Sequence, residues 1–171
     1  MTDCMHLEGQ AAWFAIQVRP RHEKSVSGVL RAKGFTEFLP TYNVRNRWAD
    51  RYKEVELPLF PRYTFCHFRP NLRARILETQ GVSGVVGFGN VPAVIEDDEI
   101  QAIQAIVSSG LPAEPHSPLK IGREVRVCAG PLAGLTGTLT KFRSSERLVV
   151  TVTLLQRAVA VEVDRDWVIQ V

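Results

Sequence analysis

The chain has 171 residues, of which 45% are hydrophobic and 23% charged, which is enough to build one or two small globular domains. No apolar run is long enough to span a bilayer, and the opening residues MTDCMHLEGQAA lack the basic start and apolar stretch of a signal peptide, so we expect a cytoplasmic protein without membrane contacts. The net charge of +3 conceals a basic tract over residues 19–53, with nine Lys or Arg against three acids, which suits either a nucleic-acid backbone or a solvated face.

The first half of the chain predicts an alternation of strands and helices. We expect residues 1–12 to be a flexible N-terminus and WFAIQV (13–18) to be a buried strand. In HEKSVSGVLRAKGF, Val26, Val29 and Leu30 recur at helical spacing before Gly34 ends the helix. Residues 35–42 are expected to be extended, and the basic stretch VRNRWADRYKE (44–54) predicts the tip of a long hairpin.

The segment PLFPRYTFCHF (58–68) predicts a strand with large apolar groups on both faces. Successive strand residues point to opposite sides, so Tyr63, Phe65 and His67 share one face. Thr64, Cys66 and Phe68 share the other. Such a strand is either buried between two layers or covered by a partner protein.

The next elements complete a mixed α/β region. Pro70 can begin a short helix, NLRARILETQ, that carries Leu72, Ile76 and Leu77 toward a core before Gly81 ends it. VSGVVGFGNVPAVI (82–95) predicts short extended pieces with glycine turns. Acids at 96–99 favour a helix start, and that helix has a predicted buried stripe of Ile100, Ile103, Ile106 and Val107.

A change of pattern divides the chain. SSGLPAEPHSPLK (108–120) has three prolines and a glycine, which predicts a semi-extended linker between a first domain at 13–107 and a second at 121–171. Beyond it, β-branched runs separated by turn residues predict a small antiparallel barrel. The fold class is therefore α+β, with a mixed first domain followed by an all-β domain.

The residues do not predict an enzyme. Cys4, Cys66 and Cys128 lie far apart without CxxC spacing or a histidine cluster, so we expect reduced thiols, no disulfide, no metal and no cofactor. Cys66 and His67 are strand neighbours that point to opposite faces and cannot share a proton.

Four ordered motifs carry a family resemblance. WFAIQVRPRHEKSV, PLFPRYTFCHF, GVSGVVGFGNVPAVIEDDEIQAI and the terminal VRVCAGPLAGLTGTLTKF with VTVTLLQRAVAVEVD resemble the NusG family of transcription elongation factors. The resemblance implies an NGN domain with an antiparallel sheet and flanking helices, a linker, and a KOW domain with an SH3-like barrel. PLFPRY and PRHEKSV are more similar to specialised paralogues of the UpxY and RfaH kind, because general members usually have glycine at the position of Arg62.

The resemblance also implies a monomer that contacts the clamp helices of the RNA polymerase largest subunit and the non-template DNA strand. The positions that match the polymerase-binding patch are Ile16, Gln17, Phe60, Tyr63 and Phe65. The alternative for these rings is that they fill the core, which we expect for Phe68. The positions expected at nucleic acid are Arg19, Arg21, His22, Lys24, Arg45, Arg47, Trp48, Arg51 and Arg73.

In the second domain the resemblance implies turn glycines and a partner surface. Gly130, Gly134 and Gly137 match family glycines and are expected to permit tight turns with positive φ. Leu154 and Leu155 match the segment that contacts the ribosomal protein NusE or the termination factor Rho. The expected function is modulation of pausing and termination, including antitermination, and the alternative is a ribosome-associated RNA-binding KOW protein.

Overall fold

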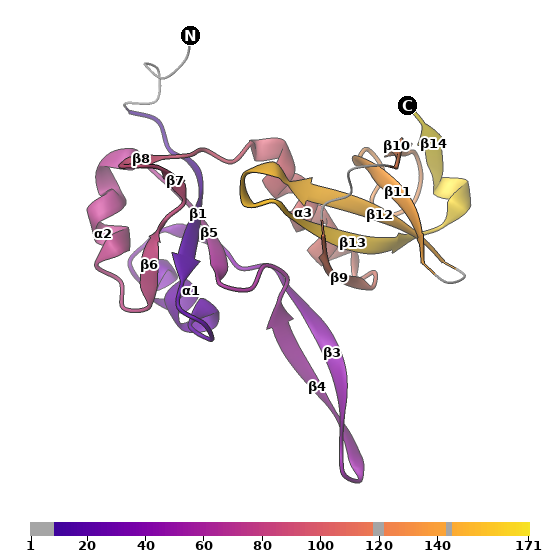
Figure 1. The fold of residues 1–171 in the computed structure, drawn as a ribbon, viewed down its shortest axis with the longest axis horizontal. Helices are drawn as coiled ribbons and strands as arrows, with labels where there is room; N and C mark the ends of the chain where they lie inside the picture. The colour runs from indigo at the N-terminus through magenta and orange to yellow at the C-terminus, as the bar shows by residue number, and fades with distance from the viewer. Residues whose placement is uncertain (1–8, 118–121, 143–144) are drawn as a thin grey trace. The chain divides into compact units, whose positions relative to one another are not determined.

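The computed structural model describes residues 9–117, 122–142 and 145–171 (Figure 1). Its contacts divide the chain into two compact units. The first unit holds the residues up to Leu39 together with Phe60–Asp97, and the second holds Pro40–Leu59 together with Asp98–Val171. No helix among the described residues is both long and apolar enough to cross a membrane.

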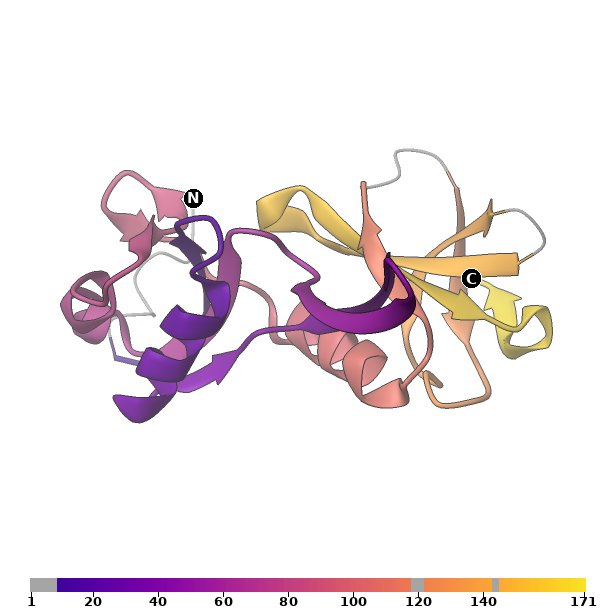
Figure 2. The ribbon, with the colours of Figure 1, turned by 90° about the horizontal axis from the view of Figure 1, so that it is seen from below.

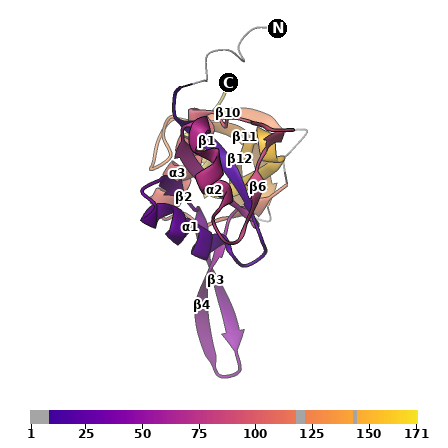
Figure 3. The same ribbon diagram turned by 90° about the vertical axis from the view of Figure 1, so that its left-hand side faces the viewer.

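The first unit is built on a four-stranded antiparallel sheet. Its order is β2 (Thr36–Phe38), β5 (Tyr63–Phe68), β1 (Ala12–Val18) and β6 (Val82–Val85). Helix α1 (Glu23–Ala32) follows β1, and a short turn η1 (Pro70–Leu72) leads from β5 into helix α2 (Arg73–Leu77). Figure 3 labels both helices together with β1, β2 and β6 of this sheet. Two short strands, β7 (Gly87–Phe88) and β8 (Val91–Pro92), form a separate hairpin. The predicted mixed α/β organisation is confirmed.

One face of this sheet carries the core that the helices cover. Phe14, Ile16 and Val18 of β1 pack with Val26 and Leu30 of α1. The same cluster includes Cys66 and Phe68 of β5 and Ile76 of α2. Phe14 lies opposite Cys66 and Ile16 opposite Thr64 in the strand register, so the predicted division of the strand into two faces is confirmed.

The glycines that follow the helices have positive φ, whereas three helix residues that were expected in a core are exposed. Gly34 and Gly81 follow α1 and α2 with φ of 87° and 95°, where a side chain would strain the backbone. Val29, Leu77 and Val107, which sequence spacing placed toward a core, are exposed. Helical spacing alone therefore does not decide burial at these three positions.

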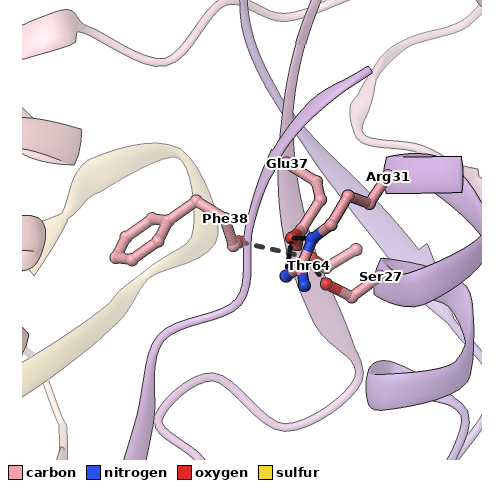
Figure 4. A network of polar contacts seen from close by, with 5 residues as sticks. All are labelled: Ser27, Arg31, Glu37, Phe38 and Thr64. Atoms are coloured by element: carbon pink, nitrogen blue, oxygen red, sulfur yellow. Dashed lines mark hydrogen bonds and ion pairs between the residues drawn. The ribbon is translucent and has the colours of Figure 1, made fainter. Parts of the chain in front are cut away.

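A buried carboxylate joins α1 to β2 (Figure 4). The Glu37 side chain is only 4% exposed, and it accepts hydrogen bonds from the Ser27 hydroxyl and from Arg31 Nε, the latter at 2.9 Å. The Thr64 hydroxyl donates to the Phe38 carbonyl oxygen at 3.2 Å, tying β5 to β2. These bonds satisfy polar groups that would otherwise be costly to bury.

The second unit contains a hairpin, a helix and a larger sheet. The hairpin is β3 (Thr41–Trp48) with β4 (Arg51–Pro58), and the helix is α3 (Asp97–Ser109). The sheet is antiparallel and six-stranded. Figure 2 views its orange and yellow strands from a second direction. Its order is β14 (Val168–Gln170), β10 (Arg123–Val127), β11 (Thr136–Phe142), β12 (Ser145–Val152), β13 (Arg157–Val163) and β9 (Ala113–His116). The predicted all-β C-terminal region is confirmed.

The segment predicted as a linker contributes to both neighbouring elements. Helix α3 continues to Ser109, and residues 113–116 form β9, which pairs with β13 at the edge of the large sheet. An edge strand tolerates Pro115 because one side of its backbone needs no ladder partner. The second sheet therefore begins before residue 121, and residues 118–120 lie outside the described part of the chain together with residues 1–8.

Candidate functional site

An aromatic face lies on the side of the first sheet opposite to the helices. Gln17 is paired with Tyr63 and Ala15 with Phe65 in neighbouring strands. The Phe60 ring meets the Phe65 ring edge-on with 5.3 Å between centroids. The Phe38 ring stacks on the Phe65 ring with 6.2 Å between centroids. We call Gln17, Phe60, Tyr63 and Phe65 the aromatic face.

The members of this face differ in exposure. Phe60 and Phe65 are 1% and 0% exposed, whereas Gln17 and Tyr63 are half-buried. Ile16 is also fully buried, but on the helix-covered side in the core cluster, so it does not belong to the aromatic face. Sequence reasoning treated the phenylalanines as exposed anchors. Their ring contacts and burial instead make them a packed aromatic cluster, and Gln17 and Tyr63 are the members of this face with accessible surface.

Basic residues gather at the turn between β1 and α1. Arg19, Arg21 and Lys24 are exposed and His22 is half-buried. The Arg19 N–H donates to the Gly81 carbonyl at 2.8 Å, and the His22 N–H donates to the Arg19 carbonyl at 3.0 Å, which fixes a tight turn. Arg21 adopts φ of 66° inside it. We call Arg19, Arg21, His22 and Lys24 the basic junction.

Sequence reasoning missed a further arginine at this end of the sheet. The Arg62 N–H donates to Glu23 Oε1 at 2.9 Å, and the Arg62 carbonyl accepts from the Val18 N–H at 2.9 Å. Arg62 is exposed and has φ of 71°. Its signal in the sequence was the departure from glycine, which is the residue that a positive φ favours.

The predicted hairpin residues lie on two different faces of the β3–β4 ribbon. Directly paired residues share a face, so Trp48 lies with Arg51 and Arg47 lies with Tyr52. The guanidinium of Arg45 lies over the Tyr52 ring at 4.6 Å from its centroid. Trp48 and Tyr52 are 67% and 60% exposed, so both rings are accessible, and Tyr52 already has a cationic partner in Arg45.

Arg73 is not brought to the basic junction. The junction adjoins the Tyr63 end of β5, whereas Arg73 opens α2 beyond the Phe68 end of that strand. Its Nε atom is buried and has no hydrogen-bond partner among the described residues.

The family glycines of the second unit divide into two kinds. Gly130 and Gly134 have φ of 76° and 95°, as predicted for turns. The prediction for Gly137 is wrong, because it lies inside β11 paired with Val125 and has no positive φ. A Cβ there would lie 2.7 Å from the Val149 carbonyl oxygen, so Gly137 is required by the close approach of two strands.

The predicted partner surface of the second unit lies in a short turn after β12. Leu154 and Leu155 belong to the turn η2 (Thr153–Leu155) and are both half-buried. The N–H and hydroxyl of Thr153 donate to Glu99 Oε1 at 3.1 and 2.8 Å, so one carboxylate of α3 holds the start of this turn.

The side chains that commonly bind metals and the buried thiol of Cys66 are the groups that bear on metal binding and catalysis. No cluster of three or more His, Cys, Asp or Glu side chains in this part of the chain could hold a metal ion. Burial, and secondarily the charge of Glu37, raises the pKa of the Cys66 thiol to about 12, so it remains a protonated core residue.

Comparisons with known proteins agree with this architecture. The family model described as transcription termination factor nusG matches residues 11–104, more than half of the chain. The transcription termination/antitermination protein NusG of Thermus thermophilus is 31% identical, with 92% of this chain and 97% of the relative covered. The corresponding protein of Deinococcus radiodurans is 27% identical, with 89% and 95% covered.

A solved structure supports the fold. The structure titled "Domain interaction in Thermotoga maritima NusG" has a TM-score of 0.60 and 18% identity, and it covers 95% of this chain and 98% of its own. At that identity the likeness shows the fold alone, whereas the family model and the Thermus relative show the family. This chain therefore belongs to the NusG family.

Proposed function

We propose that this protein is a transcription termination/antitermination factor that docks on the clamp helices of RNA polymerase through its aromatic face and contacts the non-template DNA strand through its basic residues. Membership of the NusG family supports the general role in transcription, which is not an enzymatic one. One observation carries the finer proposal, namely that the pairing of Gln17 with Tyr63 puts the aromatic face directly beside Arg19 and Arg62.

The aromatic face suits a protein partner. Tyr63 combines an apolar ring with a hydroxyl that can hydrogen-bond at an interface, and its N–H donates to the carbonyl of the buried Phe60 at 3.0 Å. The adjoining arginines suit phosphates, since protein–DNA affinity is dominated by the release of counterions from the backbone. A partner that offers protein and single-stranded DNA side by side matches both surfaces.

The docking half of the proposal is tested by comparing Tyr63→Ala with Phe65→Ala. We expect Tyr63→Ala to weaken capture of RNA polymerase at least tenfold while changing the thermal melt little, because the ring is only half-buried. Phe65→Ala is expected to cost about 3 kcal/mol of stability, because it empties a fully buried site.

A matched control keeps these effects apart. Phe88→Ala removes another aromatic ring of the first unit, one that is 78% exposed and outside the aromatic face, and we expect wild-type capture. Unimpaired capture by Tyr63→Ala would refute docking through this face. Sequencing of nascent transcripts with and without the protein would then show where it acts and in which direction.

The second unit supports a further partner contact. Leu154 and Leu155 remain the proposed contact to the ribosomal protein NusE or the factor Rho, since they lie together in one turn with part of their surface accessible. The alternative of a ribosome-associated RNA-binding KOW protein does not account for the family match at residues 11–104, which lies before the large sheet.

A further inference from the structure

Two exposed arginines with a left-handed backbone lie at the same end of the first sheet. Arg21 and Arg62 have φ of 66° and 71°, values that bulky L-residues rarely adopt and that glycine adopts without strain. Strained conformations of this kind persist where the surrounding structure holds them, and they concentrate at functional sites. Two arginines with a left-handed backbone in contacting segments therefore indicate that their side chains have a function.

The backbone of Arg62 is fixed from both sides. Its N–H donates to Glu23, whose side chain is 7% exposed, and its carbonyl accepts the Val18 N–H. Val18 directly precedes Arg19, and Glu23 directly precedes Lys24. Arg62 therefore lies beside the basic junction, although it follows His22 by about forty residues in the sequence.

Three arginines of this region, Arg19, Arg21 and Arg62, have no ion pair among the described residues. Glu23 is the one acid in residues 18–24, and one of its oxygens already accepts the Arg62 N–H. Three exposed guanidinium groups therefore lack a carboxylate partner in the part of the chain that the structure describes, which is an arrangement suited to phosphate.

We propose that Arg62 is a phosphate-binding residue that extends the basic junction along the backbone of the non-template DNA strand. The inference rests on the proposed function and adds to it a residue from a different segment of the chain. Glycine would fit the backbone of this turn without strain, but only a long cationic side chain supplies a contact to phosphate. Because phosphate contacts carry no base information, Arg62 contributes equally on every DNA sequence.

The test uses full-length protein and RNA polymerase elongation complexes of two kinds. One kind carries a complete non-template strand, and the other has a gap in that strand across the transcription bubble. Association is measured at several salt concentrations for wild type, Arg62→Gln and Arg62→Lys. Arg62→Gln keeps a long polar side chain and the strained backbone but removes the charge, so it isolates electrostatics from folding. Arg157→Gln, at an exposed arginine of β13, is the charge-matched control.

We expect Arg62→Gln to bind the complete complex about tenfold more weakly, with the salt slope reduced by roughly 0.7, which is the single-strand value for one lost phosphate contact. Arg62→Lys should recover most of this affinity, and Arg157→Gln should match wild type. On gapped complexes, wild type and Arg62→Gln should bind equally.

The outcomes separate the two proposals. If wild type prefers the complete complex but Arg62→Gln keeps the same affinity and slope, the role of Arg62 is overturned and the DNA contact of the basic junction stands. If wild type binds both kinds of complex equally, the DNA contact itself is refuted and Arg62 loses its role with it. If wild type binds neither kind, polymerase docking fails as well.

Discussion

Glu23 illustrates how much of the first unit depends on a single side chain. It is the first residue of α1 and is nearly buried, and its carboxylate anchors the turn before β5 through the Arg62 N–H. A carboxylate at the first turn of a helix is also favoured by the helix dipole. One residue therefore stabilises the start of a helix and holds the strained turn next to the aromatic face.

The strain at Arg62 predicts the direction of a stability change. A left-handed conformation costs a residue with a Cβ about 1–2 kcal/mol, which glycine avoids. Glycine also has greater entropy in the unfolded chain, and this offsets part of the stability gained by replacing the arginine. We expect Arg62→Gly to raise the free energy of unfolding by about 0.5 kcal/mol in a urea titration. Arg19→Gly, at a position without positive φ, should lower it by a similar amount. A loss of stability in both variants would contradict relief of strain.

The buried thiol of Cys66 predicts how stability responds to alkaline pH. Burial, together with the charge of Glu37, raises its pKa from the ordinary value of 9.0 to about 12. Between these values the unfolded chain has lost the thiol proton and the folded chain has kept it. Folding stability must therefore fall as pH rises above 9, by at most about 1.4 kcal/mol per pH unit.

The measurement is urea unfolding at pH 8, 9.5 and 10.5 in wild type and Cys66→Ala. Other groups titrate in this range in both proteins, so the difference between the two curves reports Cys66. We expect the advantage of wild type over the variant to shrink with rising pH. Parallel curves would mean that the folded thiol titrates like an unfolded one.

At the scale of elements, the composition of the β3–β4 ribbon changes from apolar at its base to aromatic and basic at its tip, which suits a contact to nucleic acid at the tip. Its base carries Tyr42, Val44, Val55 and Leu57 on one face, and that face continues toward the tip with polar and basic residues and Trp48. The two strands meet at Ala49, which has φ of 42°. Apolar cross-strand pairs stabilise the base, while the tip presents a ring and cations.

The two exposed rings of the ribbon should contribute differently to DNA binding. Stacking of an unpaired base on an aromatic ring is worth about 1 kcal/mol or more, so we expect Trp48→Ala to weaken association with complete elongation complexes about fivefold. Tyr52→Ala should have a smaller effect, because Arg45 already lies over that ring. Thermal melts of both variants provide the control for folding. Equal losses would mean that the face of the ribbon does not matter.

The sequence predicted which side chains share a face most reliably where apolar residues repeat with a regular period. Alternation in β5 predicted which residues of that strand share a face, and this is what the register with β1 shows. It could not predict that Phe65 would be fully buried, because exposure depends on the Phe38 and Phe60 rings that approach from other segments. Nor could it find the position of Arg62, which is set by two hydrogen bonds to distant segments.

At the scale of the whole molecule, the predicted division of the chain is coarser than the observed one. Composition identified the proline-rich segment as the change from mixed structure to strands, but AEPH has no alternation that would reveal β9. That strand exists because β13 offers it a ladder, and Glu114 adds an ion pair with Arg147 of β12. Edge strands formed in this way depend on a partner rather than on their own residues.

This pairing implies that β9 protects the protein from aggregation. Without it, β13 would present an open edge with the sequence AVAVEV, rich in β-branched residues and nearly uncharged, which is the composition that recruits other chains into intermolecular sheets. We expect a fragment beginning at residue 121 to form particles in light scattering within hours at concentrations where a fragment beginning at residue 110 stays monomeric. Replacing Val159 by Lys in the shorter fragment would not prevent this aggregation without loss of folding, because the Val159 side chain is fully buried. The four residues of β9, which the sequence presents as part of a linker, therefore cover an edge of the second sheet that would otherwise favour aggregation.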